Sequence, residues 1–213
     1  MSTPRRYASA LRAEQARLTR RRVIAAAHAL FLERGYAATT VAAVAAAAGV
    51  SQQTVYNAVG AKPALLKAVY DVALAGDDDP APIADRPGVR AVQEAPDART
   101  ALHRYAALGR GLLERAGPLL ALLLAQVPGD PDLREWLRTT DGERATGTAR
   151  AARFVADRFG LRDGLAVDEA ADLLWTLTAP EIAVRLVHDR GWSWDRYEAW
   201  LGRVMADSLL GPG

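Results

Sequence analysis

Polar side chains that can recognise a nucleic-acid base gather in one short segment, Ser51–Asn57, with the sequence SQQTVYN. The amide groups of Gln52 and Gln53 can pair bidentately with the edge of an adenine in the major groove. Ser51 is a typical N-cap, so the segment is predicted to be a helix whose first turn carries both glutamines. The segment is therefore suited to recognise the edge of a base.

A second short helix is predicted immediately before this segment. Thr40 is a good N-cap for the run of Val and Ala that follows it, and Gly49 ends that run after about two turns. Two short helices joined by a glycine-containing turn predict a helix-turn-helix, whose second helix enters a DNA major groove. Val55 is expected to hold this second helix to its own core.

Longer helices are predicted on both sides of the motif. Apolar residues at helical spacing indicate a helix from about Ala16 to Arg34, ended by Gly35, and another from Lys62 to Ala75. Residues 1–15 show no packing pattern and are expected to form a flexible basic arm. Residues 76–96 are acidic and rich in proline, which predicts a long connecting loop.

The motif and its flanking helices, residues 20–66, resemble the DNA-binding domain of the TetR family of transcriptional regulators. The resemblance implies an all-α fold, with a three-helix DNA-binding domain over residues 16–61 and a helical ligand-binding and dimerisation domain over residues 62–213. It also implies a homodimeric repressor that a small molecule releases from a palindromic operator in double-stranded DNA. The residues that carry it are Ala26, Phe31, Gly35-Tyr36, Thr40-Val41, Ala45, Ala48-Gly49-Val50-Ser51, Thr54-Val55-Tyr56, Lys62 and Leu65-Leu66.

The resemblance also assigns roles to side chains of the motif. Readout of the operator is expected to rest on the segment from Ser51 to Asn57. The sequence departs from the family pattern at Val59 and Ala61, and Pro63 removes a backbone N–H from the start of the following helix. By resemblance, Gln52, Gln53, Thr54 and Asn57 face the groove, whereas Thr40, Tyr56 and Lys62 hold the phosphate backbone.

Charge is distributed unevenly along the 213 residues. Residues 1–75 contain ten Lys and Arg against three acidic residues, a net charge of +7, whereas residues 76–213 contain 17 basic and 22 acidic residues, a net charge of −5. The N-terminal part is therefore suited to approach a polyanion. Half of the residues are apolar and only 7% are aromatic, a composition that favours an all-α chain.

After the loop, helical patterns continue to the end of the chain. The segments expected to be helical are 97–115, stopped by Gly117-Pro118, then 119–127, 131–159 opened by Asp130-Pro131, 167–189 and 194–209. Pro180 falls inside the fourth of these and is expected to kink it.

The last two predicted helices carry more apolar surface than one packing face requires. A helix that is apolar over so much of its circumference needs two partners, and the resemblance implies a four-helix bundle with a second copy of the chain. A buried core helix in a monomer is the alternative. The expected interface residues are Leu173, Leu177, Val184, Tyr197, Leu201 and Val204.

The resemblance places an effector pocket within the C-terminal helices. Its lining would be mostly leucine, which suits a largely apolar ligand, aromatic ligands included. For each residue that could orient such a ligand, plain core is the alternative. These residues are His103, Tyr105, Trp136, Phe154, Trp175 and Thr178.

Motifs for catalysis are missing from the sequence. It has no cysteine, no HExxH, no GxSxG and no phosphate-binding glycine loop, so we expect no catalytic site, no metal site and no cofactor. It also has neither a signal-peptide pattern nor an apolar run long enough to span a bilayer, so a cytoplasmic protein is expected. The remaining alternative is a helix-turn-helix that acts as an interaction or architectural module without an inducer. Tyr56 and Lys62 weigh against it, since both suit phosphate oxygens.

Overall fold

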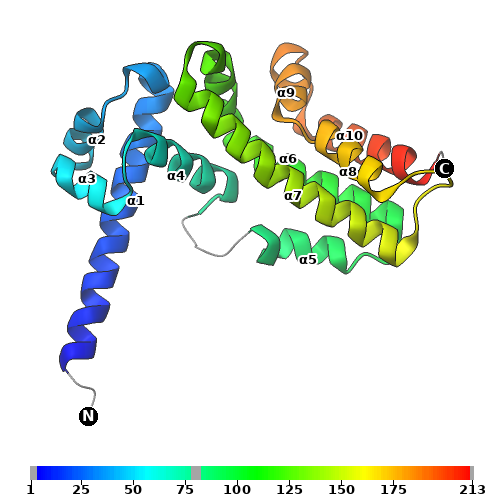
Figure 1. The fold of residues 1–213 in the computed structure, drawn as a ribbon, viewed down its shortest axis with the longest axis horizontal. Coiled ribbons are helices and arrows are strands. Elements are labelled where there is room, and N and C mark those ends of the chain that lie inside the picture. The colour runs from blue at the N-terminus through cyan, green and yellow to red at the C-terminus, as the bar shows by residue number, and fades with distance from the viewer. Residues whose placement is uncertain (1–3, 78–82, 212–213) are drawn as a thin grey trace.

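The computed structural model describes residues 4–77 and 83–211, with side chains from residue 11 onward. All regular elements in these ranges are helical, which confirms the predicted all-α class. The predicted helices over 62–75, 131–159 and 194–209 are confirmed to within one residue. The elements are α1 (Pro4–Ala38), α2 (Val41–Ala48), α3 (Gln52–Ala58), α4 (Lys62–Ala75), η1 (Ile83–Asp85), α5 (Pro87–Gln93), α6 (Ala98–Gln126), η2 (Val127–Gly129), α7 (Pro131–Phe159), α8 (Val167–Leu177), α9 (Pro180–Ala183), the π-helical η3 (Val184–Asp189) and α10 (Trp194–Leu210) (Figure 1).

The helix-turn-helix is formed by the caps that the sequence predicts. The Thr40 hydroxyl accepts the N–H of Ala43 at 3.1 Å and starts α2. Gly49 ends α2 with a left-handed φ of 64°. The Ser51 hydroxyl then accepts the N–H of Thr54 at 3.0 Å and starts α3. Local side-chain chemistry therefore sets both helix starts and the turn between them.

Helix α1 begins at Pro4, far earlier than the predicted start near Ala16, so the expected arm over residues 1–15 is helical from residue 4. Figure 1 shows this end of α1 projecting away from the other helices. Leu11 and Leu18 are 51% and 49% exposed. A helix with no packing partner carries no apolar stripe, which is why the pattern did not reveal it.

Helix α6 continues through Gly117-Pro118, where the sequence predicts that a helix ends. A proline inside a helix costs about 3 kcal/mol. The following turn buries Leu119, Leu120 and Leu123 to within 2% of full burial, and each buried leucine contributes about 1.5–3 kcal/mol. Packing of this turn outweighs the lost hydrogen bond.

The predicted loop over residues 76–96 contains the helix α5, which the sequence analysis missed; residues 78–82 of that loop lie outside the described residues. No side chain caps the start of α5. Val92 and Ala95 instead pack with Ala101 of α6 in a small apolar cluster. Tertiary packing, rather than a local signal, makes this helix.

The predicted helix over residues 167–189 is divided at Thr178 and Ala179. Pro180 does not kink a continuous helix, because it occupies the first position of a new one, α9. This position suits proline, whose missing N–H would have no partner there. The hydroxyl of Thr178 donates to the carbonyl of Leu174 at 2.7 Å and closes the end of α8.

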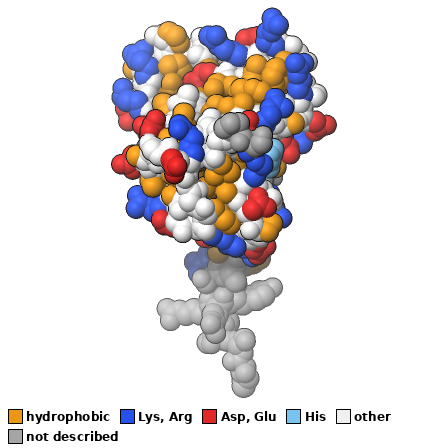
Figure 2. Space-filling model, turned by 90° about the vertical axis from the view of Figure 1, so that its right-hand side faces the viewer, with side chains coloured by type: hydrophobic (Ala, Val, Ile, Leu, Met, Phe, Trp, Pro, Cys, Tyr) orange, Lys and Arg blue, Asp and Glu red, His pale blue; other side chains and the backbone are white. Residues whose placement is uncertain are grey.

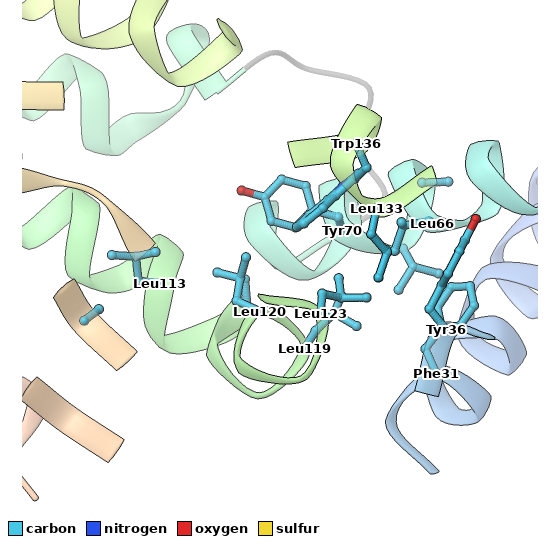
Figure 3. Close-up of a cluster of buried hydrophobic side chains, with 14 of the residues drawn as sticks. Phe31, Tyr36, Leu66, Tyr70, Leu113, Leu119, Leu120, Leu123, Leu133 and Trp136 are labelled. Atoms are coloured by element: carbon cyan, nitrogen blue, oxygen red, sulfur yellow. The ribbon is translucent and has the colours of Figure 1, made fainter. Parts of the chain in front are cut away.

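One apolar cluster joins the N-terminal helices to the C-terminal ones. It brings together side chains of α1, α4, α6 and α7, and in it Tyr70 meets Trp136 edge to face with ring centroids 5.2 Å apart. Separating the two regions would expose this apolar surface to water. Figure 3 shows Phe31, Tyr36, Leu66, Tyr70, Leu119, Leu120, Leu123, Leu133 and Trp136 in this cluster.

Gly35, at a kink inside α1, provides a test of the joint between these regions. Gly35 has φ 79° and ψ 170°, a conformation that is essentially restricted to glycine, and an added Cβ would lie 2.8 Å from Nε2 of Gln126. We predict that Gly35→Ala lowers the free energy of unfolding in urea by about 1–3 kcal/mol. Gly142→Ala, a helix-interior change into open space in α7, should raise it by about 1 kcal/mol. Equal stability of Gly35→Ala and the parent chain would contradict the account.

Candidate nucleic-acid interface and ligand cavity

Helix α3 presents a row of polar side chains to solvent. Gln52, Gln53 and Asn57 are exposed, whereas Val55 is completely buried and holds the helix to the core, as predicted. Nε2 of Gln53 donates to Oδ1 of Asn57 at 2.9 Å, one turn further along. Thr54 is half-buried. The exposed amides keep free donors and acceptors for a base edge.

Two arginines of α1 hold the helix-turn-helix in place. Arg20 donates to the carbonyl of Ala58 at 2.9 Å, at the end of α3. Arg22 donates to the carbonyls of Ala48 and Gly49, at the end of α2. A cation at a helix C-terminus satisfies unpaired carbonyls and complements the helix dipole. From the sequence, both arginines are predictable only as positive charge of the basic region, and this structural role is not.

The side chains predicted to hold phosphate differ in how freely they can move. Tyr56 is 48% exposed, and the Thr40 hydroxyl is occupied as the cap of α2. Nζ of Lys62 donates to the carbonyl of Ala37 at 3.1 Å and lies 4.2 Å from the ring centroid of Tyr36. Lys62 is therefore already a brace for the turn between α1 and α2.

A cavity of about 1000 Å³ lies between α4, α5, α6 and α7. This volume is at the upper end of the range of about 300–1,000 Å³ typical of ligand pockets. Three of the residues predicted for the pocket line it, namely Tyr105, Phe154 and Thr178. Their role as ligand contacts stays a prediction.

Most of the residues of α6 and α7 that line the cavity recur at the spacing of one helix face. Gly109 of α6 and Gly147 of α7 both line the cavity, and an added Cβ at either position would meet no atom within 4 Å. Glycine inside a helix costs about 1 kcal/mol relative to alanine, so packing does not explain these two residues. They leave room in the cavity. The wall residues are Tyr105, Leu108, Gly109, Leu112 and Leu113 on α6, and Thr140, Glu143, Arg144, Thr146, Gly147, Arg150, Ala151 and Phe154 on α7.

An ion pair connects α4 to α7 at the cavity wall. Nζ of Lys67 lies 2.6 Å from Asp71 in its own helix and 3.1 Å from Glu143 in α7. Burial by itself would lower the pKa of Lys67, but the hydrogen bonds to both carboxylates raise it above its ordinary value. The lysine is thus charged at physiological pH.

Comparison with known proteins agrees with this architecture. Residues 23–69, which span the end of α1 through most of α4, match the family model described as bacterial regulatory proteins, tetR family. The N-terminal helices α1–α4, called the TetR head below, therefore match the TetR family over these residues. No curated protein matches the chain.

Solved structures of TetR-like fold cover nearly the whole chain. NalD, the secondary repressor of the MexAB-OprM multidrug efflux pump in Pseudomonas aeruginosa, is 21% identical over 92% of this chain and 98% of its own, with a TM-score of 0.68. The SmeT–triclosan complex is 21% identical over 92% and 93%, with a TM-score of 0.64. A transcriptional regulator from Saccharomonospora viridis in complex with choline is 21% identical over 89% and 96%, with a TM-score of 0.61. The chain therefore has the two-part fold of TetR-family regulators.

Three residues predicted for the pocket lie away from this cavity, and the prediction is corrected for them. His103 is exposed on another side of α6 and lies against Gly202 of α10. Trp136 is buried in the core that joins the TetR head to the C-terminal helices. Trp175 packs under the guanidinium of Arg144, 4.4 Å from its ring centroid. Helical spacing predicted Trp136 and Trp175 to be at least half-buried, which they are, but it could not show which face of its helix each residue occupies.

For two residues, the predicted place in a dimer interface is wrong. Tyr197 and Leu201 of α10 are completely buried within this chain, so they have no surface to offer a partner. The other four predicted interface residues are half-buried, namely Leu173, Leu177, Val184 and Val204. Their role in an interface stays a prediction. Figure 2 faces the end of the molecule that carries α8 and α10, and shows apolar side chains between the charged ones.

Tyr36 joins the TetR head to the C-terminal helices, a role that sequence analysis missed. Its N–H donates to Oε1 of Gln126 at the end of α6, at 3.2 Å. Its hydroxyl donates to Oδ2 of Asp132 at the start of α7, at 3.1 Å. Burial, together with Asp132, raises the pKa of Tyr36 well above its usual range, so the hydroxyl remains a donor.

The described residues do not include a cluster of three or more His, Cys, Asp or Glu placed to hold a metal ion. Within the same residues, none of the helices combines the length and apolarity needed to cross a membrane.

The arginine braces of α1 generate a stability prediction. Arg22→Met removes the hydrogen bonds to the end of α2 and should lower the free energy of unfolding by about 1–2 kcal/mol. Arg34→Met removes only an exposed pair with Glu33 and should change it by less than about 0.5 kcal/mol. Urea unfolding followed by circular dichroism measures both. If the two variants lose the same amount, Arg22 is an ordinary surface residue.

Proposed function

We propose that this protein is a homodimeric transcriptional repressor, and that a small, largely apolar effector releases it from a palindromic operator. The observation that carries the proposal is α3, a short helix fixed by buried Val55 with Gln52, Gln53 and Asn57 exposed along it. A helix held in this way can enter a major groove without losing its own packing. The matched family of DNA-binding regulators supports the same reading.

The proposed interface divides base readout from phosphate contacts. Phosphate contacts fix the position of the protein, and base contacts supply the specificity. Ser51, which caps α3, is exposed beside the groove-facing residues. The groove-facing set is Gln52, Gln53, Thr54 and Asn57, and the phosphate-facing set is Thr40, Tyr56 and Lys62.

The proposed effector site is the cavity behind α4. TetR-fold proteins have been solved with choline and with triclosan, which supports binding of small molecules by this architecture. Helix α4 follows α3 after three residues and supplies Lys67 and Tyr70 to the cavity wall. A ligand that moves α4 can therefore alter the spacing of two recognition helices. Such a ligand must favour the released form by about 1.4 kcal/mol for each tenfold loss of operator affinity.

The competing function is an architectural or interaction module without an inducer. The cavity of about 1000 Å³, with Gly109 and Gly147 on its walls, supports the effector-responsive function, because it gives a small molecule a place to bind.

Selection of bound fragments from genomic DNA tests the proposed function as a whole. A homodimer should select an inverted repeat with half-sites presented about 34–36 Å apart, or a multiple of that distance. Equal affinity for selected and random duplexes would exclude a sequence-specific regulator.

Two substitutions separate base readout from phosphate binding. Gln53→Ala should relax preference at one position of each half-site, at a cost of about 1–3 kcal/mol on the preferred sequence alone. Lys62→Ala should weaken binding to all duplexes and flatten the dependence of log K on log salt by about one unit, whereas Lys62→Arg should keep most of both. Fluorescence anisotropy at several salt concentrations measures these effects. A uniform loss from both alanine variants would show that the roles are misassigned.

The proposed dimer interface can be tested by introducing charge. Leu177→Glu and Val204→Glu place unpaired charges on half-buried positions of α8 and α10, which should cost several kcal/mol if a second copy covers them. Sedimentation should then report monomers that remain helical by circular dichroism. Ala125→Glu, at an exposed position near the end of α6, serves as the matched control. Unchanged dimers from both test variants would place the interface elsewhere.

A further inference from the structure

The acidic side chains that line the cavity are all occupied by cations of the chain itself. Asp71 and Glu143 both pair with Lys67, and Asp77 makes two hydrogen bonds with Arg86, at 2.8 and 2.9 Å. A cationic ligand would have to share these carboxylates with a lysine or arginine that they already bind. The negative charge of the wall is therefore poorly available to a ligand.

Arg144 is a cation of the cavity wall with one donor that the described residues do not satisfy. Its guanidinium donates to the backbone carbonyl of Trp175 and, at 2.9 Å, to Oδ1 of Asp141. Nε of Arg144 is buried without a hydrogen-bond partner among the described residues, although the side chain lines the cavity. A buried donor without a partner is unfavourable. An oxygen atom of a ligand would supply the acceptor that the protein does not.

Other donors lie along the same cavity. The hydroxyl of Tyr105 has no hydrogen-bond partner within the described part of the chain, and burial raises the pKa of Tyr105 to about 12, so it stays protonated. Arg150 also lines the cavity and makes no ion pair with the described residues. Side-chain cations and hydroxyl donors attract an acceptor-rich, negatively charged group.

The remaining wall is apolar and has space for a ligand body. Leu108 and Leu112 of α6 and Phe154 of α7 line it, and the open positions of Gly109 and Gly147 keep it wide. A ligand that fits both parts must be amphipathic.

We infer that the effector of this cavity is an organic acid with an apolar body. Its carboxylate accepts hydrogen bonds from Arg144 and Tyr105, and its body lies along Leu108, Leu112 and Phe154. This inference rests on the proposed role of the cavity as the effector site, and adds the chemical class and charge of the ligand.

Three probes with the same ten-carbon chain isolate the effect of the head group. Decanoate, decanol and decyltrimethylammonium are titrated into the full chain by calorimetry, below their micelle concentrations. Decanoate should bind at least about tenfold more tightly than decanol, because its carboxylate makes charge-assisted hydrogen bonds. Decyltrimethylammonium should bind most weakly. Equal affinity of decanoate and decanol, or tighter binding of the ammonium compound, would overturn the inference.

Substitutions then assign the preference to particular side chains. Arg144→Gln should lower decanoate affinity to that of decanol and leave decanol binding nearly unchanged, which also shows that the cavity has survived. Tyr105→Phe should lower decanoate affinity severalfold without removing a charge. Arg138→Gln, an exposed change elsewhere on α7, should alter neither affinity. Retention of the full decanoate preference in Arg144→Gln would refute the assigned role.

A cavity-filling variant separates failure of this inference from failure of the proposed effector site. Gly147→Leu projects a side chain into the open space and should abolish binding of all three probes. If Gly147→Leu abolishes binding but decanoate is not preferred, the cavity remains the effector site and the anion inference is wrong. If no probe binds, or if all bind Gly147→Leu unchanged, both are wrong. Operator binding, measured on the same samples, reports independently on the TetR head.

Discussion

The burial of Tyr36 at the joint between the TetR head and the C-terminal helices is the constraint on which the structure depends. Only 1% of this residue is exposed. Its ring centroid lies 5.6 Å from that of Phe31 in α1, and the ammonium of Lys62 lies over the ring. It also forms hydrogen bonds with Gln126 and Asp132 of the C-terminal region. One residue thus fixes the head to both α6 and α7, since its backbone N–H bonds to α6 and its hydroxyl bonds to α7. The position of the recognition helix relative to the cavity follows from that attachment.

Helix α4 takes part in both regions and so provides the route between them. Leu66 and Tyr70 belong to the joint core. Lys67, the residue after Leu66, lines the cavity, and Tyr70 lines it as well. The ion pair from Lys67 to Glu143 links α4 with α7 across the same cavity. Occupancy of the cavity therefore acts on a helix that leads directly from α3. Densely packed interfaces of this kind tend to shift between discrete arrangements rather than deform gradually.

Features set by local chemistry could be predicted from the sequence. Caps such as Thr40 and Ser51 and the turn at Gly49 depend on side chains within a few residues, so the helix-turn-helix was located correctly. Features set by distant packing could not: α5 is held by contacts with α6, and the turn after Pro118 by burial of leucines. Three of the six residues predicted for the pocket do not line the cavity, because helical spacing predicts burial but not the face that meets a cavity. The glycines on the cavity walls were a readable signal that the sequence analysis did not use.

Reciprocal linkage between operator and cavity ligand tests the central claim most directly. The affinity for the selected operator is measured with and without saturating ligand, and the affinity for the ligand with and without saturating operator. The account predicts that each partner weakens the other by the same factor, which thermodynamics requires of two coupled sites. If the operator affinity does not change with ligand, and the ligand affinity does not change with operator, the cavity does not control the recognition helices. That result would contradict the account.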